Sequence, residues 1–358
     1  MSKAVFATTL LLLILGLVVL SSAGIVEGQK KFGSSYYYLT HQILYGVLPG
    51  LALMFLFFKI DYKIWKKVSL LVLFGALFLM ILVFMPNWGH DLKGATRWLD
   101  IGGLSFQPSE VLKLALIIYL AAWFGNRHDR IRNWSYGTVP FLIVLSFIAV
   151  LLLLQPDIGT LIVVTIISSA IYFFAGSSIK HFLIIGAFVV VAFTLMIAVA
   201  PYRLDRIKTF FDPSIDPRGI SYQLNQSLIA VGSGGMFGVG FGKSTQKFGF
   251  LPEVTNDSIF AILVEELGLV GAGVLIGLFT FFAFLTVKAA NNISDKFGKL
   301  LVMGVGAWIV GQAFLNIGAI IGLVPLTGIP LPFVSYGGTA MMVLLAGIGI
   351  VLNVAKRA

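Results

Sequence analysis

The chain has 358 residues, of which 58% are hydrophobic and 11% are charged. Soluble globular domains carry about 25% charged residues, so this composition excludes a soluble domain and indicates an integral membrane protein. The sequence contains no cysteine, which excludes disulfide bonds and thiolate chemistry. Any ordered loop outside the membrane must therefore be held by packing.

Long apolar stretches set the number of membrane spans. A bilayer core about 30 Å thick is crossed by about 20 apolar residues. The first stretch, Ala4 to Val26, could instead be a cleaved signal peptide. Its length favours a membrane span, because a signal's apolar core has only about 7 to 15 residues. We predict an all-α polytopic membrane protein with about ten transmembrane helices in a single domain, residues 1–358. The ten spans begin near Ala4, Leu39, Val68, Pro108, Thr138, Gly159, His181, Asp257, Leu300 and Gly338.

The basic residues indicate the orientation. With the N-terminus in the cytoplasm, Lys and Arg collect in alternate loops, as the positive-inside rule requires. Both termini are therefore predicted to be cytoplasmic, and the net charge of +10 is a topology signal rather than evidence of a nucleic-acid partner. The residues concerned are Lys59, Lys63, Lys66 and Lys67; Arg127, Arg130 and Arg132; Lys180; Lys288, Lys296 and Lys299; and Lys356 and Arg357.

Three polar segments are predicted to lie outside the membrane. Residues 86–108 carry Arg97 and Trp98 at the interface, with an ordinary interfacial hairpin as the alternative to a binding loop. Residues 201–256 form a large extracytoplasmic loop between the seventh and eighth helices, and loops of this length are usually functional or disordered. Within it, YQLNQSLIAVGSGG is compatible with a helix lying on or dipping into the membrane. Residues 326–337 precede the last helix, and their prolines and the following Gly-Gly suit either ligand approach or a tight re-entrant turn.

Carboxylates inside or near membrane spans are functional candidates by default. Glu110 and Lys113 lie three residues apart on one helical face and can form an ion pair, unless Lys113 extends outward or lines a polar cavity. Asp157, in LLLLQPDIGT, is placed to cap the start of a helix.

The eighth span carries three acidic residues, Asp257, Glu265 and Glu266. At 100° per residue, Asp257 and Glu265 differ by about 80° and Asp257 and Glu266 by about 180°, so a straight helix cannot turn all three to one site. Glu265 and Glu266 lie about 12 to 14 Å deeper and are predicted to pair within the bundle. Asp257, at the external end, is accessible to a substrate, with a helix-capping role as its alternative.

Several motifs resemble the SEDS proteins, the FtsW/RodA/SpoVE group of bacterial cell-wall polymerases, in family order and over nearly the whole chain. They are GATRWLDIG, FQPSEVLKL, QPDIGT, RIKTFFDP, YQLNQSLIAVGSGG, GFLPE, ND followed by FAILVEELG, and PLPFVSYGG. The YQLNQS and FGKSTQK segments are more similar to the FtsW division branch than to RodA.

The resemblance implies a peptidoglycan glycosyltransferase in the bacterial cytoplasmic membrane. Such an enzyme polymerises lipid II into undecaprenyl-linked glycan at the outer face, in cell division or elongation. It inverts the sugar and releases undecaprenyl pyrophosphate. The implied partners are a class B penicillin-binding protein, which supplies the transpeptidase activity, and proteins of the divisome or elongasome. No cofactor is required by the resemblance, and a divalent cation is a candidate.

By the same resemblance, Asp257 is the general base that takes the proton of the acceptor 4-hydroxyl. The leaving pyrophosphate needs cationic or metal stabilisation. Arg97 and Lys113 are the candidates for this role, and Arg203, Arg206, Lys208 and Arg218 are weaker ones. The predicted substrate-binding residues are Arg97, Gln107, Ser109, Glu110, Lys113, Arg203, Arg206, Glu253, Ser335, Gly337 and Gly338.

This chain departs from the family at one place. The family usually has a His-Thr pair before the aspartate and an aromatic residue after it, whereas this chain has Thr255, Asn256 and Ser258. The role of Asp257 is retained, and we expect the rate or its pH dependence to differ from that of relatives.

Two other functions remain as alternatives. A transporter that flips lipid II would use the carboxylates and Lys113 along a substrate pathway, although the chain has no evident inverted repeat. A noncatalytic scaffold would recruit the transpeptidase through its helices.

Overall fold

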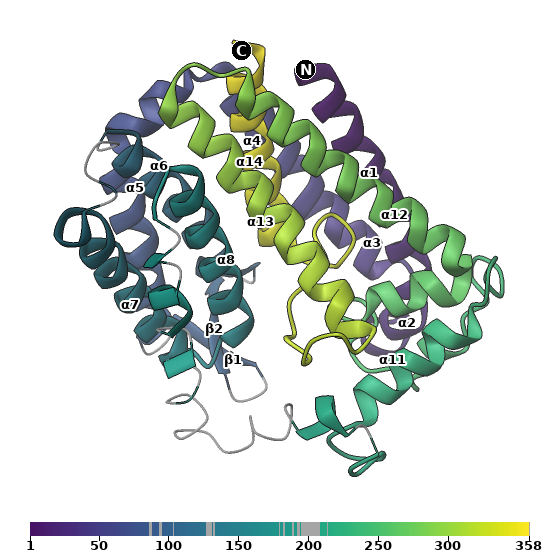
Figure 1. Ribbon diagram of the computed structural model, residues 1–358. Coiled ribbons are helices and arrows are strands. Elements are labelled where there is room, and N and C mark those ends of the chain that lie inside the picture. Colours follow the sequence, from purple (N-terminus) through teal and green to yellow (C-terminus); the bar gives the residue numbers. More distant parts are fainter. Residues whose placement is uncertain are drawn as a thin grey trace.

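The computed structural model describes residues 1–85, 88–92, 95–102, 104–126, 131, 133–178, 180–181, 183–187, 190–191, 194, 208–212 and 214–357. The molecule is built almost wholly from helices, because backbone groups in a bilayer must be paired within the protein. Figure 1 shows both termini at one end of the molecule and α11, β1 and β2 at the opposite end.

The helices follow the predicted spans. They are α1 (Ser2–Ala23), α2 (Ile25–Phe32), α3 (Tyr37–Gln42), a π-helical turn (Ile43–Val47), α4 (Leu48–Lys59), α5 (Tyr62–Leu82), α6 (Pro108–Asn126), a second π-helical turn (Trp134–Thr138), α7 (Val139–Leu154), α8 (Ile158–Phe174), α11 (Tyr222–Ser233), a short 3₁₀ turn (Gln246–Phe248), α12 (Ile259–Asn291), α13 (Lys296–Ile320) and α14 (Gly338–Lys356).

Seven stretches within the described residues are long and apolar enough to cross a membrane, namely α1, the continuous segment Tyr37–Lys59, α5, α6, α12, α13 and α14. The apolar helices α7 and α8 are shorter and correspond to two further predicted spans. The span predicted to begin near His181 lies mostly outside the described residues. The prediction of an all-α polytopic membrane protein is confirmed.

The central helices are buried on most of their surface. α13 packs against α12, α8 and α6, and α14 packs against α4. Trp308, Phe279 and Tyr172 are fully buried among these helices. α1 packs on α12, with Leu12 and Leu20 in the core. The surface that remains exposed is largely apolar and suited to lipid.

Residues 86–108 contain a small antiparallel sheet in the order β1 (Gly89–Leu92), β2 (Ala95–Ile101) and β3 (Leu104–Phe106). In its register, Gly89 lies opposite Leu99, and Leu99 lies opposite Phe106. The segment therefore folds as a three-stranded antiparallel meander, and its binding role stays a prediction. β3 leads directly into α6, so the sheet lies beside the amino end of that helix.

α12 is broken at Gly268, where φ is 66° and ψ is −168°, a conformation that favours glycine. A loop from the preceding segment pairs the backbone groups that the break exposes. The N–H groups of Val239 and Gly240 donate to the carbonyls of Glu265 and Glu266 at 2.9 and 3.1 Å. In return, the N–H groups of residues 269 and 270 donate to the carbonyls of residues 235 and 236 at 2.9 and 3.1 Å.

The break explains why residues 222–240 dip alongside α12. α11 packs against α12, its residue Gln223 reaches the start of that helix, and the segment after it fills the break. The helix predicted within YQLNQSLIAVGSGG is therefore confirmed as α11, and it packs on α12. The last turn before the break has its peptide groups paired as membrane burial requires.

Candidate functional site

Asp257 lies in the turn just before α12, and Ser258 is the residue at the helix cap position. The capping alternative for Asp257 is therefore wrong. Its carboxylate is half-buried, and Oδ2 accepts a hydrogen bond from Nε2 of Gln223 on α11 at 3.3 Å. The same Nε2 donates to Oγ of Ser258 at 3.1 Å. The amino end of α12 favours negative charge at this position.

The turn that holds Asp257 is bonded to the loop before α14. The N–H of Tyr336 donates to the carbonyl of Thr255 at 2.8 Å, and Oγ of Ser335 donates to the carbonyl of Asn256 at 2.5 Å. Asn316 on α13 donates to the carbonyls of Asp257 and Ile329, both at 2.8 Å. Segments 253–257 and 326–337, predicted separately as site segments, thus form one unit.

Glu253 belongs to the same unit. It has a positive φ of 54°, and its Oε2 accepts a hydrogen bond from Nδ2 of Asn256 at 2.7 Å. Thr255 donates through Oγ1 to Glu27 Oε2 at 3.1 Å. The residues that replace the family's usual pattern before Asp257 therefore have partners, Asn256 within this unit and Thr255 on α2.

Gln42 and His41, at the end of α3, fix the loop before α14. Gln42 donates through Nε2 to the carbonyl of Ser335 at 3.3 Å and accepts at Oε1 from the N–H of Gly337 at 2.9 Å. Burial and the nearby Tyr37 raise the pKa of Tyr336 to about 12. The Tyr336 hydroxyl shares a hydrogen bond of 3.0 Å with Nδ1 of His41.

Gly338 begins α14 in a crowded position. A Cβ there would lie 3.1 Å from the carbonyl oxygen of Tyr45. The predicted pair Gly337 and Gly338 thus allows close backbone approach, and the backbone that approaches at Gly338 is the protein's own.

Glu110 and Lys113 form a buried ion pair on α6. Their charged atoms are 2.8 Å apart, and the two side chains are 3% and 1% exposed. The ion-pair alternative is therefore confirmed, and extension of Lys113 to the membrane surface is wrong. Nζ of Lys113 also donates to Oε1 of Gln312 at 3.0 Å and lies 5.1 Å from the ring centre of Trp308.

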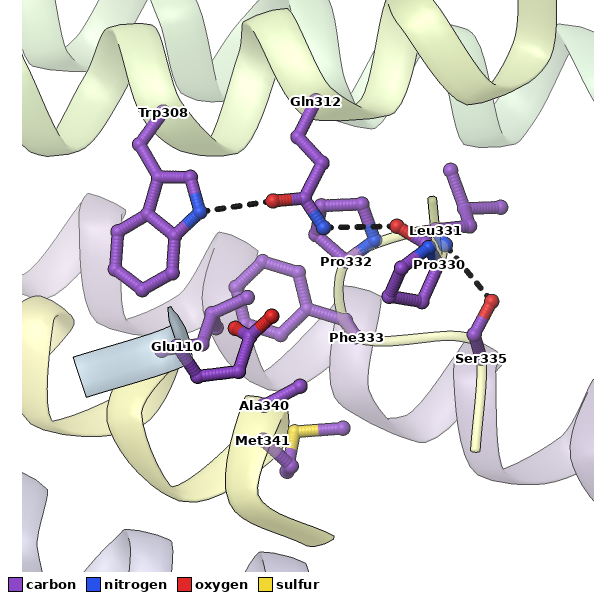
Figure 2. Close-up of a pocket in the computed structure, with 11 residues that line it drawn as sticks. Glu110, Trp308, Gln312, Pro330, Leu331, Pro332, Phe333, Ser335, Ala340 and Met341 are labelled. Atoms are coloured by element: carbon purple, nitrogen blue, oxygen red, sulfur yellow. Dashed lines mark hydrogen bonds between the residues drawn. The ribbon is translucent and has the colours of Figure 1, made fainter. Parts of the chain in front are cut away.

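Gln312 connects this ion pair to the loop before α14. It accepts from Nε1 of Trp308 at 2.9 Å and donates to the carbonyl of Pro330 at 2.8 Å, as Figure 2 shows. The pocket between Glu110, Gln312 and Ser335 has a volume of about 20 Å³, which is room for about one water molecule. In this conformation the pocket is too small for a sugar.

Gln107 and Ser109 lie at the start of α6. The N–H of Gln107 donates to Oγ1 of Thr339 at 3.4 Å, which ties the helix to α14. Ser109 is buried, and its hydroxyl has no hydrogen-bond partner within the described part of the chain.

Arg97 lies on β2 and is half-buried. Its Nε donates to the carbonyl of Gln155 at 3.0 Å, and a second N–H donates to the carbonyl of Pro156. Pro156 has a φ of 30°, so Arg97 stabilises a strained turn between α7 and α8. Asp157, next in this turn, caps α8 through Thr160 N–H at 3.1 Å, as predicted.

The remaining predicted cations are Arg203, Arg206, Lys208 and Arg218. Arg203 and Arg206 lie outside the described residues, and Lys208 and Arg218 are exposed. Among the residues that the structure describes, no group of three or more His, Asp or Glu side chains is arranged to hold a metal ion.

Glu265 and Glu266 bind the loop at residues 244–247, which precedes α12, as expected for residues that pair within the bundle. Glu265 accepts from the N–H of Thr245 at 2.9 Å and from the Ser244 hydroxyl. Glu266 forms a buried ion pair with Lys247 at 2.8 Å. These contacts fix the dipping segment and lie apart from the turn that holds Asp257.

Three residues of this site were not anticipated from the sequence: Gln42, Gln223 and Asn316. Each is a polar side chain in or beside an apolar stretch, and such residues are rare in membrane spans unless they have a partner. That signal was present, but their partners lie 13 to 295 residues away in the chain.

Comparison with known proteins agrees with these observations. The family model described as cell cycle protein, FtsW/RodA/SpoVE, matches residues 2–358. Stage V sporulation protein E of Bacillus subtilis is 38% identical, over 97% of this chain and 95% of that protein. A probable peptidoglycan glycosyltransferase FtsW of Thioalkalivibrio sulfidiphilus is 42% identical, over 98% of this chain and 88% of the relative.

Solved structures have the same fold. One chain of a peptidoglycan synthase complex, described as coordinating polymerization and crosslinking, is 26% identical with a TM-score of 0.83, covering 99% of this chain and 97% of the other. Thermus thermophilus RodA is 26% identical with a TM-score of 0.72, covering 99% and 96%. The family match over almost the whole chain, together with the multi-pass helical fold and the assembled motifs, shows that this chain belongs to the FtsW/RodA/SpoVE family.

Proposed function

We propose that this protein is a peptidoglycan glycosyltransferase that polymerises lipid II at the outer face of the cytoplasmic membrane. The observation that carries the proposal is the position of Asp257, a half-buried carboxylate in a turn held by Gln223, Asn316 and Ser335. A carboxylate held in place can act as a general base, worth about 10² to 10⁴-fold in rate. Relatives named as probable peptidoglycan glycosyltransferases support the same activity.

The proposed reaction forms one bond and breaks one. The acceptor's 4-hydroxyl gives its proton to Asp257, and its oxygen bonds to the anomeric carbon of the donor sugar. The bond from that carbon to the pyrophosphate oxygen breaks, and its electron pair leaves with undecaprenyl pyrophosphate. Attack from the face opposite the leaving group inverts the configuration of the sugar.

Arg97 and Lys113 support the site by positioning its parts. Arg97 is engaged by the α7–α8 turn, and Lys113 is engaged by Glu110 and Gln312. The chain Lys113–Gln312–Pro330 holds the loop whose Ser335 bonds to the Asp257 turn. Direct stabilisation of the pyrophosphate is proposed for Arg203 and Arg206, which the sequence places in the extracytoplasmic loop.

The proposed orientation has both termini in the cytoplasm and Asp257 outside. Two observations support it. Both termini lie at the end of the molecule opposite α11 (Figure 1), and Arg357 pairs there with Asp61 at 2.6 Å, among the lysines that start α5. The proposed partner is a class B penicillin-binding protein in a division or elongation complex, which the similarity to a peptidoglycan synthase complex supports.

Purified protein and lipid II provide the test. Wild type and Asp257→Asn are compared with and without the cognate transpeptidase, and glycan length is measured on a gel. We expect polymer from wild type, and at least a 100-fold lower rate from a variant with unchanged melting temperature and elution volume. No polymer from wild type even with the partner, together with lipid II flipping in vesicles that survives Asp257→Asn, would favour a transporter instead.

A further inference from the structure

A groove between α5 and α6 has no role in the proposed reaction. It lies where the start of α5 meets the end of α6, and its volume is about 350 Å³, within the range of small-ligand sites. Lys66, Ser69 and Leu70 line it from α5, and Tyr119, Trp123 and Asn126 line it from α6. Each set is spaced at three or four residues, so each is one face of a helix.

The groove lies at the level of the membrane interface. Lys66 is four residues into α5, about 6 Å from its first residue, and Asn126 is the last residue of α6. Asp61, which caps α5, pairs with Arg357 at the C-terminus, so the groove lies at the end of the molecule that carries the termini. Trp123 and Tyr119 are of the type that favours this depth.

Lys66 gives the groove a positive charge that no described residue balances. Its side chain is half-buried, and within the part of the chain that the structure describes it has neither a hydrogen-bond nor an ion-pair partner. No acidic side chain lines the groove among the described residues. Lys63 and Lys67 on the same helix are exposed and add to the field. A half-buried cation without a counterion is stabilised by an anionic ligand.

The surface next to the groove suits an acyl chain. Leu70 lines the groove and is 55% exposed, and Phe74 and Phe78, one and two turns further along α5, are 64% and 58% exposed. These side chains form an apolar stripe from the interface toward the bilayer centre. A phosphate at Lys66 would therefore have its hydrocarbon tail directed along α5.

We propose that this groove binds the headgroup of one anionic phospholipid, such as phosphatidylglycerol, from the cytoplasmic leaflet. Lys66 contacts the phosphate, Asn126 and the aromatic side chains surround the headgroup, and the Leu70–Phe78 stripe holds an acyl chain. Basic pockets between helices on the cytoplasmic side are suited to such headgroups. The inference rests on the proposed topology but not on the proposed glycosyltransferase activity.

Native mass spectrometry of the delipidated full-length protein tests the proposal. The protein is titrated with phosphatidylglycerol or phosphatidylcholine of the same acyl composition. We expect one phosphatidylglycerol to bind about tenfold more tightly than phosphatidylcholine, because one lysine near a membrane surface is worth about fivefold and partial burial adds to this. Millimolar inorganic phosphate should not displace the lipid.

Neighbouring residues provide matched variants. Lys66→Gln should lose the preference for phosphatidylglycerol, and Lys66→Arg should keep it. Lys67→Gln removes the same charge from the next, exposed position and should match wild type within about twofold. Asn126→Asp, at the exposed end of the groove, should weaken phosphatidylglycerol binding by a similar factor to Lys66→Gln. It provides the same test if Lys66→Gln does not fold. Equal losses in Lys66→Gln and Lys67→Gln, equal binding of the two lipids, or displacement by phosphate would overturn the proposal.

Discussion

The buried ion pair between Glu266 and Lys247 allows a quantitative test of how the dipping segment is held. The Glu266 carboxylate contacts Lys247 Nζ at 2.8 Å, Ser22 Oγ at 2.7 Å and the N–H of Ser244 at 3.3 Å. Both charged side chains are at most 3% exposed. Glu266→Gln removes the negative charge and leaves the Lys247 ammonium buried, with only neutral oxygens such as the carbonyl of Gly242 at 2.7 Å.

Removing one partner of a buried ion pair costs about 3 to 5 kcal/mol, because the remaining charge is left without compensation. That is a large part of a typical unfolding free energy of about 5 to 15 kcal/mol. We therefore expect Glu266→Gln to lower the melting temperature in detergent strongly and to expose residues 234–248 to protease. Lys31→Gln is the control, because it removes the surface ion pair with Glu27, in which the Lys31 side chain is 59% exposed. This change should cost under about 1 kcal/mol.

A double-mutant cycle with Lys247→Met completes this test. The double variant should be more stable than the sum of the single effects predicts, with a coupling of about 1 to 3 kcal/mol, because it leaves no buried charge unpaired. Additive effects, or a cost of Glu266→Gln below about 1 kcal/mol, would refute the reasoning that this ion pair holds the segment at the α12 break.

Three further outcomes are expected. Gly268→Ala should destabilise the protein by more than about 2 kcal/mol, measured by thermal unfolding in detergent. The reason is that φ is 66° at this position and a Cβ would lie 2.4 Å from both the Gly238 nitrogen and the Met236 oxygen. An equal cost for Gly273→Ala, where a Cβ meets open space, would contradict this. Asp157→Ala should cost about 1 kcal/mol of stability because the α8 cap is lost, whereas Asp157→Asn should keep the stability of wild type. A loss of stability in Asp157→Asn would show that the cap needs the charge. The Lys63 N–H and Arg357 lower the pKa of Asp61, so the contribution of this carboxylate to stability is present above the usual carboxyl pKa of about 4 and is lost as pH falls through the lower folded-state pKa. The melting-temperature difference between wild type and Asp61→Asn should therefore shrink below about pH 4. A difference that stays constant with pH would contradict the assignment.

The spans, the ion pair and the α8 cap could be predicted because each depends on local sequence. Apolar length identifies a span, a three-residue spacing brings Glu110 to Lys113, and an Asp before an apolar run caps a helix. The direction in which the Lys113 side chain points could not be predicted from local sequence, because it depends on Gln312, which is 199 residues away. Sequence spacing alone left that question open.

The break in α12 could not be predicted from its own residues. Gly268 is followed by Leu269 and Val270, whose apolar character continues the helix pattern. What permits the break is the loop at residues 235–240, which supplies the hydrogen bonds the helix lacks. The argument from a straight helix separated Asp257 from Glu265 and Glu266 correctly, although Asp257 lies before the helix and the helix is interrupted two residues after Glu266.

The most direct test of the proposed function compares two aspartates that lie at the starts of helices, Asp257 before α12 and Asp157 before α8. Asp257→Asn and Asp157→Asn make the same chemical change, but only the first removes the proposed base, since Asn still caps α8. The measurement is the rate of glycan formation from lipid II by each variant, with its partner transpeptidase and at matched folded concentration. We predict a loss of at least 100-fold for Asp257→Asn and a rate within about twofold of wild type for Asp157→Asn. Equal rates for wild type and Asp257→Asn would contradict the assignment of Asp257 as the base.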